Sequence, residues 1–347
     1  MPASRPAPPA ADLPVDRERV RHLLMQLVPE PGVRRGSLDV DVDLAPRPAG
    51  EGWDNVLWPV GTVDGLPVVL RVVRRRSARP LRDRELAVLR RLALLSAELP
   101  LRIPTILATA PDALLIPWVP GRSAAESSLP HRRRSATGLA SMLAALHSLP
   151  PRDLADLERN PVRGVPLAGR AEALAADLER AELPADLRRA ARDVADRGLE
   201  APVWDGEDRL LHGDPHPGNV VVPTVDPDRD PAPDEDHDAV RDRARTGALI
   251  DWGDATLGDP ASDLGALLLH DPRGELLARY RRHATWNGIE DEARWSALLE
   301  RARAWSVRLS LALVTAYDSA HPLGRSGTEL LRAVEEGELT PARRPGT

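Results

Sequence analysis

The fold of this chain is decided by the stretch Leu211-His212-Gly213-Asp214-Pro215-His216-Pro217-Gly218-Asn219-Val220, read together with Ile250-Asp251-Trp252-Gly253-Asp254. Each stretch starts with apolar residues typical of a short buried strand and continues into a polar turn. The turns contribute two aspartates and an asparagine, at Asp214, Asn219 and Asp251. Because carboxylate and amide oxygens can accept a proton or bind a hard cation, these side chains are candidates for a reaction centre.

The first stretch has the spacing H-x-D-x-x-x-x-N, which is that of the catalytic loop of kinases. This spacing has a geometric reason. The chain leaves a strand at Leu211, presents Asp214 and turns back through Pro217-Gly218, so Asn219 is expected beside the carboxylate rather than beyond it. Such an arrangement suits phosphoryl transfer, in which the aspartate accepts a hydroxyl proton and the asparagine binds magnesium.

Asp251 follows a second apolar strand, Ala248-Leu249-Ile250. Pairing of this strand with the strand that ends at Leu211 would put Asn219 and Asp251 on one side, where they can share a cation. The alternative is a pair of unrelated turns in which aspartates cap the backbone. The occurrence of both motifs in order, each after apolar strand residues, favours the shared cation site.

Composition restricts the class of protein. The 347 residues suffice for one bilobal unit or two domains, and the absence of cysteine excludes disulfides, thiolate metal sites and a cysteine nucleophile. A formal net charge of -6 without an arginine stripe argues against a nucleic-acid partner. No apolar run is long enough to span a membrane. The Pro- and Ala-rich segment 1–16 lacks the apolar region of a signal peptide and predicts a disordered leader on a cytoplasmic protein.

The order of the predicted elements indicates two lobes. Residues 17–118 form the first lobe, and 119–337 the second, which is mainly helical. The elements expected in the first lobe are a helix at Val15–Leu27, a three-strand antiparallel meander at 37–44, 55–60 and 66–73, a helix at Leu81–Leu95, and strands at Pro104–Thr109 and Ala113–Pro117. The helices expected in the second are at 132–147, 171–182, 184–197, 260–268, 274–283 and 290–317. The Pro- and Asp-rich segment 223–246 predicts a loop insertion, and 338–347 a flexible tail.

The chain resembles the aminoglycoside phosphotransferase and choline-kinase-like family. The resemblance extends from about Leu38 to Leu269 and is most specific in HGDPHPGNV (212–220) and IDWGDATLGDPASDL (250–264). It implies an α+β, protein-kinase-like bilobal fold, with a small antiparallel β-rich N-lobe and a larger helical C-lobe. By this resemblance Asp214 is the catalytic base, Asn219 and Asp251 bind magnesium, and His212 and Asp263 brace the catalytic loop through hydrogen bonds.

A nucleotide site is expected in the first lobe. Gly52-Trp53-Asp54-Asn55 resembles the short turn that covers the phosphates in this family, although Asp-Asn is also ordinary turn chemistry. Arg71 stands where protein kinases place a phosphate-binding lysine, and Glu85 stands where the carboxylate partner would be. The chain has no lysine, so arginine at this position departs from the family pattern. The alternative to a phosphate contact is an exposed salt bridge between Arg71 and Glu85.

Two further positions complete the nucleotide site. The segment 114–121 resembles the interlobe segment of the family. By this resemblance, backbone groups at Ile116 and Trp118 meet the adenine edge. The segment can also be an ordinary linker between domains, and the two interpretations are compatible. Trp252 replaces the phenylalanine of the kinase DFG segment and is expected to pack as a core aromatic. The cofactors implied are ATP, with GTP possible, and Mg²⁺.

The sequence predicts a small-molecule O-phosphotransferase that acts as a monomer or homodimer. The family phosphorylates antibiotics of the aminoglycoside and macrolide types, and an antibiotic acceptor is the leading expectation. An amino-alcohol or sugar kinase is the alternative enzyme, and a nucleotide-binding pseudokinase is the alternative without catalysis. A metal-dependent hydrolase fits poorly because separated ligand clusters are missing. Candidates for acceptor contacts are Trp286, Trp295, Trp305, Tyr317, Asp271 and Asp318.

Overall fold

The computed structural model describes residues 10–33, 38–41, 47–96, 98–150, 157–223 and 247–339. Most of the predicted leader, acidic insertion and tail, as well as the end of the predicted strand at 37–44, lie outside these ranges. The chain divides into two compact units. The first comprises the described residues within Met1–Glu98, with Ile103–Pro120 and Asp251–Gly253, and the second comprises Leu99–Arg102, Gly121–Ile250 and Asp254–Thr347.

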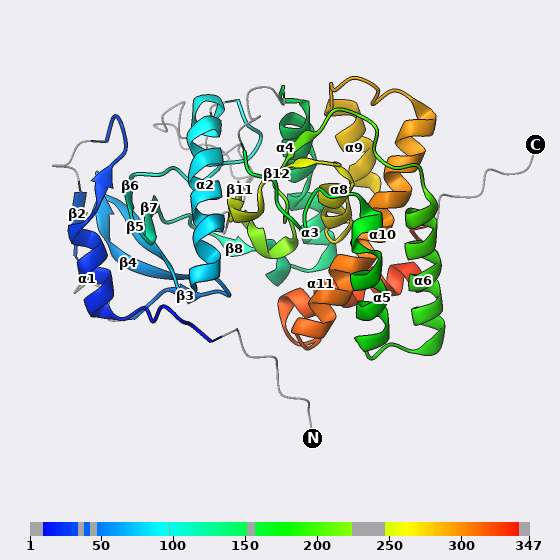
Figure 1. The fold of residues 1–347 in the computed structure, drawn as a ribbon, viewed down its shortest axis with the longest axis horizontal. Coiled ribbons are helices and arrows are strands. Elements are labelled where there is room, and N and C mark those ends of the chain that lie inside the picture. The colour runs from blue at the N-terminus through cyan, green and yellow to red at the C-terminus, as the bar shows by residue number, and fades with distance from the viewer. Residues whose placement is uncertain are drawn as a thin grey trace, which may run out of the picture. The chain divides into compact units, whose positions relative to one another are not determined.

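The first unit is built on an antiparallel sheet in the order β1-β6-β7-β5-β4-β2, with β3 paired to β4 (Figure 1). The strands are β1 (Val28–Pro29), β2 (Leu38–Val40), β3 (Gly50–Glu51), β4 (Asn55–Val63), β5 (Leu66–Val73), β6 (Ala108–Ala110) and β7 (Ala113–Pro117). The predicted meander is confirmed, since β2 pairs with β4 and β4 with β5. The strand expected at Pro104–Thr109 begins only at Ala108.

Burial explains why these segments form strands. Buried and half-buried residues alternate along β4, so one face of this strand is directed to the core. In β5, by contrast, the six residues from Val68 to Val73 are all buried, because this strand lies inside the sheet between β4 and β7. Helix α1 (Arg17–Met25) closes the core with Val20 and Leu23, and Asp16 caps its N-terminus.

Helix α2 (Arg79–Leu92) brings charged groups into the first unit. It begins with Pro80 in its first turn, where a missing N–H costs nothing. Arg84 and Glu85 are buried together with Val88 and Leu89, so this helix carries a carboxylate below the surface. Buried carboxylates need a partner, and that of Glu85 is described below.

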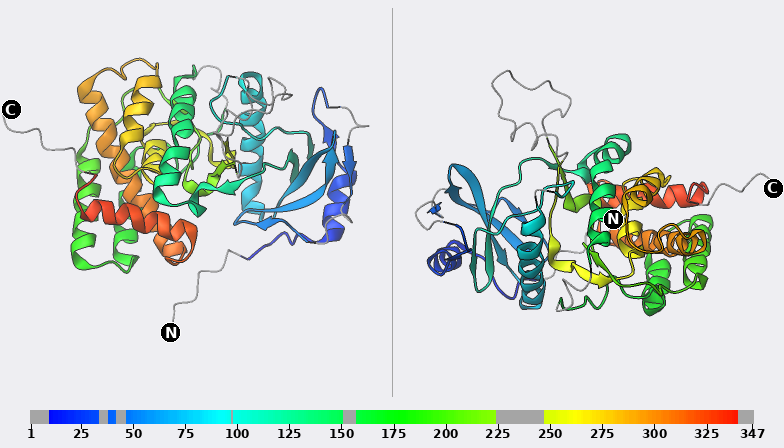
Figure 2. Two further views of the ribbon diagram at one scale, coloured as in Figure 1. Left: turned by 180° about the vertical axis from the view of Figure 1, so that it is seen from behind. Right: turned by 90° about the horizontal axis from the view of Figure 1, so that it is seen from above.

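The second unit is mainly helical (Figure 2). Its helices are α3 (Leu129–Ser135), α4 (Thr137–Ser148), α5 (Ala171–Arg180), α6 (Ala185–Glu200), α8 (Ala261–Leu268), α9 (Glu275–His283), α10 (Glu292–Ala316) and α11 (Pro322–Glu335). The long helix α10 packs against α6, α8 and α11, while α4 packs against α9. The buried side of α10 includes Trp305 and Leu309, which belong to the core of this unit.

Two small sheets in the second unit carry the motif residues. Strand β10 (Val220–Val222) pairs with β11 (Ala248–Leu249) on one side and with β8 (Arg122–Ser123) on the other. Strand β9 (Arg209–Leu211) pairs with β12 (Thr256–Gly258). The predicted pairing of the strand that ends at Leu211 with the strand before Asp251 is therefore wrong, because β9 pairs with β12, and the strand before Asp251 pairs with β10, which follows Asn219.

The structure corrects two helix predictions. The helix expected at 132–147 is two helices, because Ala136 leaves helical geometry with ψ near 0° between α3 and α4. Helix α11 was not predicted, although His321 as N-cap and Pro322 at the first helical position are start signals. The predicted α+β class is confirmed, with a small antiparallel β-rich unit and a larger helical unit.

Candidate functional site

The loop between β9 and β10 is held by the carboxylate of Asp263. Its Oδ2 accepts a hydrogen bond from the His212 N–H at 2.8 Å, and its Oδ1 accepts one from the Gly213 N–H at 2.9 Å. Asp263 is fully buried, so both oxygens depend on protein donors. Gly213 has a φ of +88°, and a Cβ on it would lie 2.1 Å from the carbonyl oxygen of Asp254. The start of the loop therefore requires glycine.

Two histidines of the loop use one nitrogen as acceptor and direct the other to an oxygen. In His212, Nδ1 accepts from the Asp214 N–H at 3.3 Å and Nε2 lies 3.1 Å from the carbonyl oxygen of Ile250. In His216, Nδ1 accepts from the Gly218 N–H at 2.9 Å and Nε2 lies 3.6 Å from Oδ2 of Asp214. Through these contacts both rings fix the conformation of the loop.

Asp214 is presented by this loop with about a fifth of its side chain exposed. Its Oδ1 lies 2.9 Å from Nη2 of Arg163, in an ion pair whose side chains are 17% and 18% exposed. Burial by itself would raise the pKa of Asp214, but Arg163, followed by His216 and His212, outweighs burial and leaves this pKa below its ordinary value. The carboxylate is therefore ionised at neutral pH and able to accept a proton.

Asn219 closes the loop at the start of β10. Its Nδ2 donates to the backbone oxygen of Asp214 at 2.9 Å, and its own backbone oxygen accepts from the Ile250 N–H at 3.0 Å. Since the amide nitrogen is used in this bond, the side-chain oxygen is the atom available to a cation. The loop thus offers the kind of oxygen ligand that magnesium prefers.

A buried chain of polar groups supports Asp263 from behind. His147 Nε2 lies 3.3 Å from Oδ2 of Asp263, and His147 Nδ1 lies 2.8 Å from the hydroxyl oxygen of Tyr280. Trp286 Nε1 donates to the same hydroxyl at 3.0 Å. Burial raises the pKa of Tyr280 above its ordinary value, which keeps the phenol protonated. The positions of α4 and α9 are thereby linked to the loop through Asp263.

In the first unit, Arg71 joins two carboxylates. One nitrogen of its guanidinium forms an ion pair with the buried Glu85, and Nη2 lies 2.5 Å from Oδ1 of Asp251. Arg71 itself is about a tenth exposed, so it is not part of an exposed salt bridge. Asp251 adopts a left-handed conformation with a φ of +65°. Trp252 follows it, fully buried, with its N–H 3.3 Å from Oε1 of Glu85.

The turn between β3 and β4 is fixed by arginines that follow β5. The Gly52 N–H donates to the Asn55 carbonyl at 2.9 Å, and the Gly52 carbonyl accepts from Nη1 of Arg74 at 2.9 Å. Arg75 forms an ion pair with Asp54. A Cβ at position 52 would make only an ordinary contact of 3.7 Å with the Asn55 oxygen, so packing does not demand glycine there.

The end of β7 carries the residues predicted to meet adenine. Ile116 pairs with Val69 inside the sheet, and the Trp118 N–H donates to the Pro67 carbonyl at 2.8 Å. The indole of Trp118 is 41% exposed. With its amide used in the sheet, Trp118 has its carbonyl oxygen and its ring left for a ligand.

A family model described as the phosphotransferase enzyme family matches residues 46–230 and 238–305. The chain belongs to this family. The match confirms the family resemblance and the prediction of a phosphotransferase. No curated protein sequence matches the chain.

Solved structures agree with this assignment at the level of the fold. The GDP complex of wild-type aminoglycoside 2'-phosphotransferase-IIIa has a TM-score of 0.57 at 17% identity, over 93% of this chain and 99% of that chain. The GDP and kanamycin complex of APH(2")-IIia has a TM-score of 0.56 at 19% identity, over 93% and 99%. Macrolide 2'-phosphotransferase type I has a TM-score of 0.51 at 19% identity, over 92% and 98%. The predicted kinase-like fold is thereby confirmed.

Within the described ranges, the phosphotransferase has no group of three or more His, Asp or Glu side chains arranged to hold a metal ion. Asn219 and Asp251 carry amide and carboxylate oxygens, which are ligand types that magnesium accepts. The donor types present therefore fit Mg²⁺ better than zinc. In the same part of the chain, no helix is long and apolar enough to cross a membrane.

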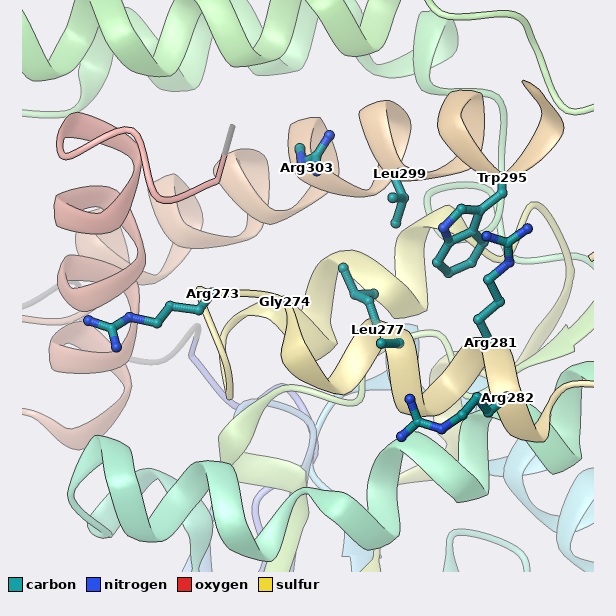
Figure 3. A pocket seen from close by; sticks show the side chains of 9 residues that line it. Arg273, Gly274, Leu277, Arg281, Arg282, Trp295, Leu299 and Arg303 are labelled. Atoms are coloured by element: carbon teal, nitrogen blue, oxygen red, sulfur yellow. The ribbon is translucent and has the colours of Figure 1, made fainter. Parts of the chain in front are cut away.

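Most of the aromatic candidates for acceptor contacts are core residues of the phosphotransferase. Trp286, Trp295 and Trp305 are at most 8% exposed. Trp295 also lines a cavity of about 550 Å³ together with Leu277 and the paired Arg281 (Figure 3). The ring of Tyr317 stacks on His321 just before α11.

The two acidic candidates serve the backbone. Asp318 accepts hydrogen bonds from the Ala320 and His321 N–H groups. Asp271 accepts one from the Leu276 N–H at 2.8 Å, and burial raises its pKa. These contacts stabilise turns at helix ends, so neither aspartate needs an acceptor to explain its position.

Sequence reasoning missed three residues that this arrangement depends on, namely Arg163, His147 and Tyr280. Each comes from a segment outside the two motifs, and none has a spacing that distinguishes it from a surface arginine or a core aromatic. A partial signal existed for Arg163, since Asn160-Pro161 and Gly164 mark a tight turn around it.

Proposed function

We propose that this phosphotransferase moves the γ-phosphoryl group of ATP, or of GTP, to a hydroxyl group of a small molecule in a Mg²⁺-dependent reaction. The observation that carries the proposal is Asp214. It is an ionised carboxylate, partly exposed, on a loop that Asp263 and two histidines hold in place. A general base requires this combination of access, fixed position and an available lone pair.

In the proposed step, the acceptor hydroxyl oxygen attacks the γ-phosphorus and a new P–O bond forms. The bond from the γ-phosphorus to the bridging oxygen breaks, and the nucleoside diphosphate leaves with that electron pair. The hydroxyl proton passes to Asp214. Because the protein forms no covalent bond, its contribution is to orient the acceptor and stabilise charge.

We assign the remaining predicted residues to the nucleotide. Asn219 and Asp251 would bind the metal, whose charge would neutralise the phosphate oxygens during transfer. Arg71, held by Glu85, would contact the phosphates through a permanently charged guanidinium. The turn from Gly52 to Asn55 would cover the phosphates. We further assign Ile116 and Trp118 to the adenine. His212 and Asp263 would act only by holding the loop.

The chemical class of the acceptor is proposed from the structural neighbours. Structural neighbours are named as aminoglycoside and macrolide phosphotransferases, and these names support an antibiotic as the first class to test. An amino-alcohol or a sugar is the alternative. A pseudokinase is the alternative without transfer, and the presence of Asp214, Asn219 and Asp251 together argues against it, because mere nucleotide binding does not require a base.

The test is Mg²⁺-dependent ATP consumption with a panel of aminoglycosides, macrolides, choline, amino-alcohols and sugars. Asp214→Asn keeps the shape of the side chain and removes the base. Asp205→Asn is the matched control, because Asp205 is an exposed aspartate that pairs with Arg294. Acceptor-stimulated turnover that collapses in Asp214→Asn and persists in Asp205→Asn supports the proposal. ATP binding without transfer to any acceptor supports the pseudokinase, and transfer unaffected by Asp214→Asn refutes the assignment of the base.

A further inference from the structure

The two oxygens of the Asp214 carboxylate have different surroundings. Oδ1 lies 2.9 Å from Nη2 of Arg163 and is shielded from solvent. Arg163 is held on this side, because its Nε lies 3.8 Å from Oδ2 of Asp254, and Oδ1 of Asp254 accepts from Nδ2 of Asn160 at 2.8 Å. The side chain of Asp214 is nevertheless 18% exposed, so this exposure falls on the edge that carries Oδ2. Oδ2 is therefore the oxygen that an acceptor molecule can reach.

The neighbour of this exposed oxygen is the ring of His216. Nε2 of His216 lies 3.6 Å from Oδ2 of Asp214, which is longer than the separation of about 2.7–3.2 Å in an N–H···O hydrogen bond. The side chain of His216 is also 18% exposed. Among the residues that the structure describes, none forms a hydrogen bond with Nε2. Both atoms thus border a gap that is open to solvent.

The ring of His216 is fixed through its other nitrogen. Nδ1 accepts from the Gly218 N–H at 2.9 Å, so His216 caps the short helix η8 (Pro217–Asn219). The backbone N–H of His216 donates to the Asp214 carbonyl, and its carbonyl accepts from the Asn219 N–H, both at 2.9 Å. A Cβ on Gly218 would lie 2.5 Å from Cε1 of the ring, so the imidazole packs directly on the glycine backbone. Every polar atom of His216 except Nε2 is therefore engaged within the loop.

Capping by itself does not account for histidine at position 216. The best caps are asparagine, aspartate, serine and threonine, each of which supplies one acceptor oxygen. Histidine supplies an acceptor and, in addition, a second nitrogen on the other side of the ring. Because a backbone N–H can only donate, Nδ1 is the acceptor and the ring carries its hydrogen on Nε2. A fixed N–H donor therefore lies beside the exposed oxygen of Asp214.

We propose that His216 is a second catalytic residue, which donates from Nε2 to the hydroxyl oxygen of the acceptor while Oδ2 of Asp214 accepts the hydroxyl proton. The inference rests on the proposed function. A hydroxyl group has one hydrogen and two lone pairs, and two atoms that are 3.6 Å apart can both bond to it. The lone pair that remains is the one that attacks the γ-phosphorus, so the acceptor is oriented before transfer.

In this step, the O–H bond of the acceptor breaks and its proton passes to Oδ2 of Asp214. The free lone pair of the oxygen forms the new bond to the γ-phosphorus. The bond from the γ-phosphorus to the bridging oxygen breaks, and the nucleoside diphosphate leaves with that electron pair. His216 keeps its proton throughout, and Arg163 remains at Oδ1 of Asp214. The contribution of His216 is thus a hydrogen bond and not a proton transfer.

Two variants separate the donor from the cap. In His216→Asn the side-chain oxygen can accept from the Gly218 N–H, as Nδ1 does, but no donor reaches the position of Nε2. This variant should be as stable as the wild type, with kcat/KM for the acceptor lower by on the order of tenfold, the loss expected for one hydrogen bond. In His216→Gln the longer side chain can place its NH₂ group near the position of Nε2, and the cap is lost. This variant should unfold at a lower denaturant concentration and retain more activity than His216→Asn.

The measurement is phosphoryl transfer from ATP, with Mg²⁺, to kanamycin, erythromycin, choline, D-glucose and water, the last as hydrolysis of ATP without an added acceptor. KM for ATP and denaturant unfolding are determined for the same proteins. KM for ATP should be unchanged in His216→Asn, because Nε2 contacts the acceptor and not the nucleotide. His283→Asn, at an exposed histidine on α9, is the control and should match the wild type in all three measurements.

Other results overturn one proposal or both. Wild-type activity in His216→Asn, or greater activity in His216→Asn than in His216→Gln, overturns the role of His216. The proposed function survives this result if transfer depends on Asp214. A raised KM for ATP in His216→Asn assigns Nε2 to the nucleotide and overturns its contact with the acceptor. If transfer to none of these acceptors is lost in Asp214→Asn, the proposed base is refuted and the role of His216 with it.

Discussion

Arg71 and Asp251 are 180 residues apart in the chain, and Nη2 of the arginine lies 2.5 Å from Oδ1 of the aspartate. The same guanidinium holds Glu85, which is buried in α2. A lysine ammonium has one charged nitrogen, whereas the arginine fork presents a separate nitrogen to each carboxylate. Arginine at position 71 can therefore hold the carboxylates of Glu85 and Asp251 at the same time, in a chain that contains no lysine.

Replacement of Arg71 should lower the affinity for the nucleotide. We expect Arg71→Ala to reduce kcat/KM for ATP by on the order of 100-fold, or ~3 kcal/mol, because a phosphate contact is lost and Glu85 is left buried without its counter-ion. Arg71→Lys should lose less, since it keeps the charge. Steady-state kinetics with ATP varied, together with denaturant unfolding, separates weaker nucleotide binding from a general loss of stability.

The control for this prediction is Arg90→Ala. Arg90 pairs with Glu30 on the surface of the same unit, where half of its side chain is exposed. An exposed pair contributes less than about 1 kcal/mol, so kinetics and stability should hardly change. Equal kcat/KM values for ATP in Arg71→Ala and Arg90→Ala would refute the phosphate contact.

Arg163 should set the acidic limit of activity. The pKa of Asp214 is lowered because Arg163 and the two loop histidines outweigh burial. In Arg163→Gln burial dominates, so the pKa of Asp214 rises. A base works only when it is deprotonated, and a higher pKa therefore moves the acidic limb of the kcat/KM profile to higher pH. The measurement is kcat/KM for the acceptor against pH, from about pH 4 to about pH 8.

Arg163→Lys is the matched variant, because it retains a positive charge near Asp214. Its acidic limb should lie closer to that of the wild type than the limb of Arg163→Gln does. A limb that stays in place in Arg163→Gln, or moves to lower pH, would show that Arg163 does not control the protonation of the base.

The sequence motifs predicted much of this arrangement because the interactions concerned are local. The spacing from His212 to Asn219 fixes a single turn, and a turn of that length returns the asparagine to the aspartate backbone, as its hydrogen bond to the Asp214 carbonyl shows. The meander follows from alternating and continuous apolar runs. In such segments the residues that interact are close in sequence or belong to neighbouring strands.

The contacts that sequence reasoning missed join distant segments without a periodic pattern. Arg163 lies 51 positions before Asp214 in a turn rich in proline and glycine, and no spacing rule connects the two. His147 is 116 residues from Asp263 and looks like one more residue of an apolar helix. Such partners are defined by tertiary packing, because a buried carboxylate needs donors from whichever elements surround it.

Asp263 should be needed for both stability and turnover. Asparagine has the same shape as aspartate, but it replaces one acceptor oxygen with an NH₂ group. That group would face the N–H of His212 or Gly213, or the ring of His147, in place of the oxygen. A buried N–H donor would then have no acceptor. We expect Asp263→Asn to lower the free energy of unfolding by about 2–3 kcal/mol. It should also reduce kcat while the Kd for ATP is maintained, because the loop carries the base.

Ser262→Ala is the control for Asp263→Asn, since it changes the neighbouring residue. The Ser262 hydroxyl is buried without a hydrogen-bond partner among the described residues, so its removal should leave stability unchanged or slightly higher. Denaturant unfolding and turnover are measured for both variants. Similar losses in the two variants would mean that any change at the start of α8 disturbs the fold, and that Asp263 has no particular role.

His270 should make the stability of the protein depend on pH. Its Nε2 lies 3.1 Å from the carbonyl oxygen of Pro215, next to Asp214 in the chain. Burial, followed by the charge of Arg132, lowers the pKa of His270 from 6.5 to about 3. Below pH 6.5 the unfolded chain therefore takes up a proton that the folded chain refuses, and stability falls as the pH falls toward 3.

His270→Gln tests this linkage, because its amide can donate to the Pro215 carbonyl and does not titrate. Between about pH 7.5 and about pH 5, the wild type should lose about 2 kcal/mol more of its free energy of unfolding than the variant does. His283→Gln, at an exposed histidine on α9, is the control and should follow the wild type at both pH values. The measurement is denaturant unfolding at the two pH values. Equal pH dependence in the wild type and His270→Gln would mean that the buried ring is protonated in the folded state and that its environment stabilises the imidazolium.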